Sequence, residues 1–182
     1  LARASIVDWH GKVLLDTCVQ VPHRVTDFRT RYSGIKPHHL TSSQALSMES
    51  CRQRVTDLLR DKILVGHALK NDLGALMLTH PQQDIRDTAH YRPYQQQRGG
   101  AKATKQEATR GSSSSGKYVP RKLRDLVADF CDGMAIQRPG QGGHDSVEDA
   151  QASMLLFQKA RAAWEAMLEK KKQKKKNKQK QA

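Results

Sequence analysis

The chain alternates short, strongly apolar runs with longer stretches in which apolar residues recur at helical spacing. Near the start, "ASIVDW" and "KVLLDTCVQV" are separated by His10 and Gly11, which predicts a β-hairpin. "KILVGHA" predicts a short buried strand, and "QDIRDT" a further one. Helices are expected within "SSQALSMESCRQRVTDLLRD", "NDLGALMLTH" and "RKLRDLVADFCD", and over the last long stretch. A hairpin followed by strands interleaved with helices predicts an α/β fold in which helices flank a mixed sheet.

The last helix begins at "GGHDSVEDAQASM", where two interpretations compete. Ser146 precedes Asp149 by three residues, as in a capping box, and an acid in a first turn also suits the helix dipole. His144, however, lies five residues before Asp149, so the same acid could belong to an active site. The apolar positions that predict this helix are Val147, Ala150, Met154, Phe157, Trp164 and Leu168.

A second polar group follows the predicted strand in "LVGHALKNDLGAL". Gly66 and His67 end the strand, and Asn71 and Asp72 stand at the start of the next helix. Ligands of α/β proteins collect at such strand ends, which makes Asp72 a candidate functional residue. The structural alternative is a first-turn acid behind an Asn71 N-cap.

The formal charge of +14 is concentrated in two segments of low complexity. Residues 170–182 hold eight lysines and no acid, and residues 95–118 carry a net charge of +4, which leaves about +2 for the body. Both segments have too little apolar surface to offset the entropy of ordering, so we predict disorder for each. The lysines suit a nuclear import signal or an arm that contacts phosphates, and equally a solvated tail without function.

Cysteine content and hydropathy indicate the compartment. The three cysteines, Cys18, Cys51 and Cys131, form no C-x-x-C motif, which favours a reducing environment. No apolar run approaches the length of a membrane span, and no leader pattern is present. We therefore expect an intracellular protein without a membrane partner.

Five blocks in order resemble one known family. "LARASIVDWHGKVLLD", "VTDFRTRYSGIKPHHL", "ILVGHALKNDLGAL", "DIRDT" and "GGHDSVEDAQASM" are similar to the DEDDh 3′–5′ exonucleases, in particular the eukaryotic RNA exonuclease 4 branch. The resemblance implies a ribonuclease H-like fold for an exonuclease domain over residues 1–168. A disordered basic insertion at 95–118 and a Lys-rich disordered tail at 169–182 complete the expected organisation.

The resemblance also implies a reaction. Family members remove nucleotides from 3′ ends with two divalent metal ions, Mg²⁺ or Mn²⁺, held by four acids. Carried over, Asp149 and Asp72 are metal ligands, and His144 is the general base that takes a proton from the attacking water.

Substrate contacts and setting are implied in the same way. Arg29 and Arg31 belong to a loop expected near the substrate, where Arg suits phosphate, although solvation of the loop explains them equally well. His67 either orients the site or packs. The partners implied are RNA, single-stranded DNA as an alternative, and pre-ribosomal particles; a monomer in the nucleus, and in particular the nucleolus, is expected.

The chain departs from the family at one motif. The first two acids of the family form a D-x-E on the opening strand, and this sequence contains no D-x-E. We therefore expect a fragment truncated at its first strand and inactive by itself. A non-catalytic RNA-binding or pre-ribosome-binding module is the alternative, while an HD-type phosphohydrolase is excluded because no distal aspartate follows Asp149.

Overall fold

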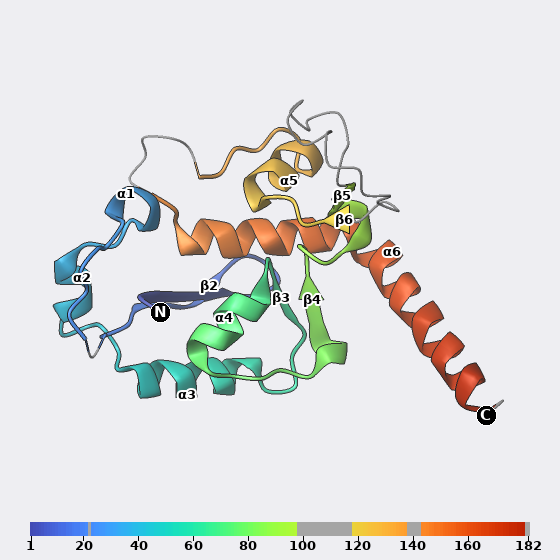
Figure 1. Cartoon of the computed structure of the whole chain (residues 1–182), viewed down its shortest axis with the longest axis horizontal. Coiled ribbons are helices and arrows are strands. Elements are labelled where there is room, and N and C mark those ends of the chain that lie inside the picture. The colour runs from blue at the N-terminus through green and yellow to red at the C-terminus, as the bar shows by residue number, and fades with distance from the viewer. Residues whose placement is uncertain (22, 98–117, 138–142, 181–182) are drawn as a thin grey trace, which may run out of the picture.

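The computed structural model describes residues 1–21, 23–97, 118–137 and 143–180 (Figure 1). Its elements follow in chain order as β1 (Arg3–Val7), β2 (Val13–Cys18), α1 (Thr30–Ser33), α2 (Pro37–Thr41), α3 (Met48–Leu59), β3 (Leu64–Gly66), α4 (Leu69–Leu76), η1 (Gln82–Asp84), β4 (Ile85–Asp87), η2 (Arg92–Tyr94), β5 (Gln96–Gln97), β6 (Tyr118–Val119), α5 (Leu123–Phe130) and α6 (Ser146–Lys180).

The predicted hairpin is confirmed. β1 and β2 pair antiparallel, with an irregularity in the register between Ile6 and Val7. Asp8 closes the turn because its Oδ1 accepts hydrogen bonds from the backbone N–H groups of His10 and Lys12, each at 2.9 Å. Gly11 supplies the left-handed backbone conformation, with φ of 79°, that the turn requires.

The two later strands are also confirmed, but the expected mixed sheet is divided. β3 and β4 pair in parallel, with Gly66 opposite Asp87. Within the described residues the strands form three separate two-stranded sheets, β1–β2, β3–β4 and β5–β6, instead of one mixed sheet. No described backbone hydrogen bond joins β1 to β3, although both strands pack against α6. The helix thus aligns the two strand pairs that bear on the site.

The core lies on two sides of the strands. Cys51 and Val55 of α3 pack with Leu15, Val19 and Leu76 on one side. On the other side, α5, α6 and the segment around η2 form a larger cluster that Val65 of β3 contacts. Figure 1 shows β2, β3 and β4 between α6 and α3, with α5 lying over α6.

Helix α6 is anchored to the body by aromatic stacking and by an ion pair. The ring of Trp164 stacks on Tyr91 at 4.1 Å between centroids. Arg86 of β4 donates from Nε and Nη2 to the two carboxylate oxygens of Glu165 at 2.7 and 2.9 Å, and the pKa of Glu165 is lowered by these bonds. This bidentate geometry fixes the parallel strand pair to the helix.

Disorder was predicted for the tail and for the insertion at 95–118. The tail was expected to be disordered from residue 169, whereas α6 continues as a helix to Lys180 and projects away from the body (Figure 1). Lys and Gln are good helix formers, and extending a helix that is already nucleated costs little. Of the insertion at 95–118, residues 98–117 lie outside the described residues, and its two ends are not irregular: they pair as β5 and β6.

Candidate active site

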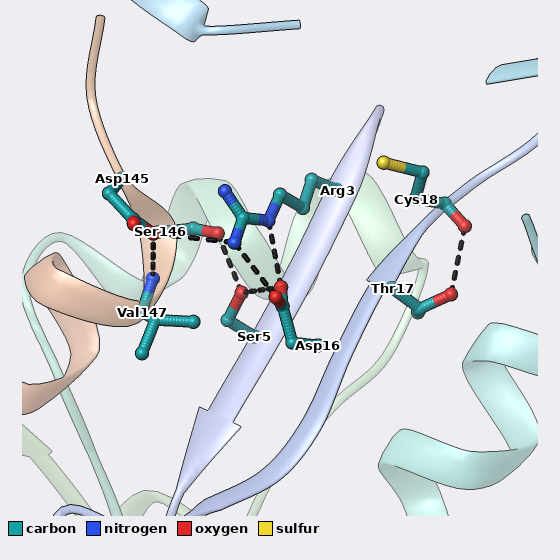
Figure 2. Close-up of polar contacts among 8 residues, drawn as sticks. All are labelled: Arg3, Ser5, Asp16, Thr17, Cys18, Asp145, Ser146 and Val147. Atoms are coloured by element: carbon teal, nitrogen blue, oxygen red, sulfur yellow. Dashed lines mark hydrogen bonds and ion pairs between the residues drawn. The ribbon is translucent and has the colours of Figure 1, made fainter. Parts of the chain in front are cut away.

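Helix α6 begins with a cap that differs from the predicted one. Asp145 is the capping residue, because its Oδ1 accepts the backbone N–H of Val147 at 2.9 Å. The Oγ of Ser146 instead lies 2.6 Å from the Oγ of Ser5 on β1 (Figure 2). The predicted capping box of Ser146 and Asp149 is therefore wrong, and the Asp149 side chain is available for another role.

An arginine ties the hairpin to this helix start. Arg3 donates from Nε and Nη2 to the Asp16 carboxylate at 2.7 and 2.8 Å, and its Nη2 lies 3.3 Å from Oδ1 of Asp145 (Figure 2). The Ser5 hydroxyl also donates to Asp16. The hydrogen bonds from Arg3 are the largest reason that the pKa of Asp16 is lowered. The cluster therefore fixes the first turn of α6, and with it Asp149, against β1 and β2.

The structure brings His144 and Asp149 close together. Nδ1 of His144 lies 3.7 Å from Oδ2 of Asp149, and their side chains are 51% and 28% exposed. The backbone N–H of His144 donates to the carbonyl oxygen of Tyr32 in α1 at 2.7 Å. The histidine is thus held by its backbone while its ring reaches solvent beside a half-buried carboxylate.

Gln137 is a partner of Asp149 that the sequence did not reveal. Its Nε2 donates to Oδ1 of Asp149 at 2.7 Å, and its backbone N–H donates to Oε2 of Glu148 at 3.0 Å. Burial is the largest effect on Asp149 and raises its pKa, while the bonds from Gln137 and His144 act in the opposite direction. No motif links Gln137 to Asp149, because the contact depends on how the chain returns to α6.

A close contact between two glycines places His144. Gly143 has φ of 102°, and a Cβ added there would lie 2.4 Å from the backbone nitrogen of Gly34. Only a residue without a side chain allows this approach without displacing backbone. The 143–144 segment therefore docks directly on the end of α1.

His67 lies within electrostatic range of the same carboxylate. Its Nδ1 is 2.9 Å from Oγ1 of Thr88, whose hydroxyl donates to the Gly66 carbonyl at 3.0 Å. Burial lowers the pKa of His67, and the charges of Asp87 and Asp149 partly oppose that effect. Of the two roles that the sequence left open, the contact with Thr88 and the burial support a half-buried histidine that packs.

Asp72 stands in the first turn of α4, but the cap of that helix is not Asn71. The N-cap is Ala68, with φ of 62°, and the prediction for Asn71 is wrong. The carboxylate of Asp87 takes the place of a side-chain cap, because it accepts the N–H groups of Ala68 and Leu69 at 2.8 and 3.0 Å. Burial and the Asp87 charge together raise the pKa of Asp72, whose side chain still reaches solvent.

The two candidate arginines line one pocket. Arg29 and Arg31 surround a pocket of about 490 Å³ together with Asp27, Thr30 and Tyr32. Arg29 is the residue before α1 and has a left-handed φ of 47°, a strained conformation for a residue other than glycine. Because Tyr32 also accepts the bond from His144, this pocket adjoins the start of α6.

The described residues by themselves do not complete a metal site. No group of three His, Cys, Asp or Glu side chains able to hold a metal occurs among them. Two Mg²⁺ or Mn²⁺ ions need several carboxylate oxygens, and Asp72 and Asp149 supply only two carboxylates. The donor chemistry suits such ions, but the number of donors does not.

Comparisons with known proteins bear on the class to which this chain is similar. No protein-family model matches the chain. The chain is 41% identical to RNA exonuclease 4 of Candida glabrata over 161 residues, which cover 88% of this chain and 52% of that protein. The human RNA exonuclease 4 is 37% identical over 166 residues, covering 91% of this chain and 34% of that protein. The chain thus spans about half the length, or less, of these relatives.

Solved structures give the same class. The Saccharomyces cerevisiae Pan2 pseudoubiquitin hydrolase–RNA exonuclease module, in complex with AAUUAA RNA, superposes with a TM-score of 0.65 and 31% identity. The match covers 93% of this chain and 26% of that one.

The similarity to RNA exonuclease 4 proteins and to the Pan2 module supports a ribonuclease H-like α/β fold and is consistent with the class of DEDD-type exonucleases. Within that class, its homologues at about 40% identity over most of this chain are RNA exonuclease 4 proteins.

Proposed function

We propose that this chain carries the active site of an exonuclease that removes nucleotides from RNA 3′ ends. The observation that carries the proposal is the pair of His144 and Asp149, held together at the start of α6 in a homologue of RNA exonuclease 4. Fixing of the histidine backbone by Tyr32 and of the carboxylate by Gln137 supports a preorganised pair.

In this proposal His144 is the general base. Its Nδ1 faces Asp149, so Nε2 is the nitrogen that takes the proton from the attacking water. The Asp149 carboxylate then lies beside the imidazolium that forms, with Oδ2 3.7 Å from Nδ1. Burial lowers the pKa of His67, and this residue is assigned no proton transfer in the scheme.

Divalent metal ions, when bound, would supply charge that activates water and neutralises the phosphate. We assign Asp72 and Asp149 as two of their ligands and assign the others to acids outside the described residues, since those residues do not suffice. The chain as given is therefore expected to show little or no cleavage with Mg²⁺ or Mn²⁺.

A nuclease assay tests this directly. A 5′-labelled single-stranded RNA is incubated with the 182-residue chain and with the same chain preceded by a family-like strand that bears D-x-E. We expect stepwise shortening from the 3′ end only with the longer protein, and none with EDTA. Vigorous trimming by the 182-residue chain would contradict the assignment of the missing ligands.

The cellular setting forms part of the proposal. We place the protein in the nucleus, and in particular the nucleolus, as a monomer that trims ribosomal RNA precursors in pre-ribosomal particles. The eight lysines of 170–182 support this, because they suit both nuclear import and phosphate contacts. Arg29 and Arg31 are proposed to contact the substrate backbone. Single-stranded DNA offered in the same assay tests whether RNA is preferred.

A second candidate is a module that binds RNA without cutting it. The shortage of metal-ligating groups among the described residues favours it, as does the Lys-rich end of α6. It predicts RNA binding with a steep salt dependence and no product even when the D-x-E strand is present. Product formation by the longer protein would exclude it.

A further inference from the structure

One aromatic ring stands apart from the other partly exposed rings. Tyr32 is 65% exposed, compared with 40% for Trp9 and 39% for Phe130. Trp9 packs edge-on against Phe157, and Phe130 packs against Tyr94. Among the described residues Tyr32 has no aromatic partner of this kind, so its ring presents a free face to solvent.

The backbone that carries this ring is rigidly held. The N–H of Tyr32 donates to the Arg29 carbonyl at 2.7 Å, and its own carbonyl accepts the N–H of His144 at 2.7 Å. Within α1, the Thr30 hydroxyl donates to the Ile35 carbonyl at 2.6 Å. A large apolar ring kept exposed on a fixed turn loses little entropy when a ligand stacks on it.

The surroundings of the ring are cationic. Tyr32 lines the pocket of about 490 Å³ together with Arg29 and Arg31. Asp27 also lines it, but its Oδ2 lies 3.7 Å from Nε of Arg29, so these two charges largely offset each other. Arg31 forms no ion pair with the described residues and remains as the cation beside the ring.

We propose that Tyr32 is a stacking platform for one base of the RNA, with Arg31 holding an adjacent phosphate. The inference rests on the proposed function, since the ring and the candidate base His144 share one backbone hydrogen bond. An aromatic face beside a guanidinium is the arrangement that single-stranded nucleic acids use, and it accepts any base because every base has a π-face. The platform therefore holds the 3′-terminal base without selecting its identity.

The test measures binding by the 182-residue chain in EDTA, where no cleavage interferes. A short single-stranded RNA carries the fluorescent base 2-aminopurine at its 3′-terminal nucleotide, or at an internal one. Stacking on Tyr32 should quench the terminal probe more than the internal one. Tyr32→Ala and Tyr32→Leu should remove this extra quenching and weaken binding about fivefold to a hundredfold, the range for one base–aromatic stack. Tyr32→Phe should keep both.

Controls separate stacking from charge and from folding. Arg31→Gln should lower the slope of log Kd against log salt by about one phosphate contact and leave the quenching of the terminal probe in place. Met77→Ala, which shortens another exposed apolar side chain, should change neither property. Because the Tyr32 ring is exposed, folding does not depend on it. Tyr32→Leu should therefore have the same melting temperature as the parent.

Each outcome bears on one claim. If the parent binds RNA while Tyr32→Ala and Tyr32→Leu bind and quench as the parent does, the stacking inference is wrong and the proposed function stands. If the parent has no affinity for single-stranded RNA, both fail.

Discussion

At the scale of single residues, the acids fall into two groups whose pKa values move in opposite directions. The pKa of Asp16 is lowered because Arg3 donates to it. The pKa values of Asp72 and Asp149 are raised, with burial as the largest cause. A carboxyl group with a lowered pKa stabilises the fold once ionised, whereas one with a raised pKa costs stability when ionised. The first behaviour suits a structural acid and the second an acid kept for chemistry.

This contrast predicts the effect of neutralising the candidate site acids. Asp149→Asn should leave the melting temperature at pH 7 unchanged or raise it by a few degrees. Asp72 is exposed, so solvent screening should make the effect of Asp72→Asn smaller. The stabilising contribution of a raised-pKa acid is present below its unfolded pKa and is lost as pH rises through its folded pKa. Any gain in melting temperature over the parent should therefore vanish in acid and grow as the pH rises above the folded pKa. Thermal melts from pH 3 to 8 measure it, and a clear loss of stability at pH 7 would make these acids structural.

Asp16 should show the opposite pH dependence. Its stabilising contribution is present above the unfolded pKa and is lost as pH falls through the lowered folded pKa. Asp16→Asn should therefore destabilise the fold at neutral pH, and this loss of stability should become smaller in acid. The same series of thermal melts measures the loss.

Asp87 should be important for the stability of the fold. Its buried carboxylate accepts the backbone N–H groups of Ala68, Leu69 and Ala89 and contacts Nδ1 of His90 at 3.0 Å. Asp87→Ala leaves buried donors without acceptors, and we expect a loss of about 2–4 kcal/mol in the free energy of unfolding. Urea denaturation measures this loss, and a change below about 0.5 kcal/mol would remove Asp87 from the account.

At the scale of elements, the site depends on how the start of α6 meets α1. Gly143→Ala should be strongly destabilising, because a Cβ there meets the Gly34 backbone and the residue has positive φ. Gly133→Ala is the matched control, with φ of 72° and nothing within 4 Å of the added Cβ. We expect Gly133→Ala to cost about 1 kcal/mol and Gly143→Ala clearly more, together with a change in the backbone NMR signals of His144. Equal costs for the two variants would mean that the contact with Gly34 is unimportant.

The sequence predicted elements better than their connections. Apolar periodicity located the hairpin, β3, β4 and helices α3, α4, α5 and α6, because each pattern depends on near neighbours. Helices α1 and α2, which lie in a polar stretch, were not predicted. The cap by Asp145, the cap of α4 by Asp87 and the bond from Gln137 to Asp149 were not predicted, since they join residues through the tertiary fold. The catalytic roles of His144 and Asp149 were predicted only with the help of family resemblance. From spacing alone, capping was the favoured explanation.

At the scale of the whole molecule, the far end of α6 is a charged extension of a neutral body. The segment beyond Leu168 is exposed through Gln179, and Figure 1 shows it leaving the domain. Among the described residues, no helix is long and apolar enough to cross a membrane, this extension included. Disorder was predicted here because the segment has too few apolar residues to contact the core. A helix that continues from a packed segment needs no core contact of its own.

This extension can be removed to test its role. Deleting residues 170–182 should leave the melting temperature of the body unchanged, because the deleted part contributes nothing to the described core. Non-specific RNA affinity should fall, and the slope of log Kd against log salt should become shallower by several phosphate contacts. Nuclear accumulation of a tagged protein should fall as well. A truncated chain with the same salt slope would show that the lysines do not contact RNA.

The central claim is that Asp149 serves catalysis and is not a helix cap. The decisive measurement is the rate of RNA 3′-end trimming, with Mg²⁺, by the chain preceded by a D-x-E strand and by its Asp149→Asn variant. Asn still accepts the bond from Gln137, so the variant should fold and be at least as stable as the parent. We predict that its metal-dependent cleavage is abolished, while His144→Ala slows trimming by about 10²-fold or more, as expected for a lost general base. Near-normal turnover by a folded Asp149→Asn variant would contradict the account.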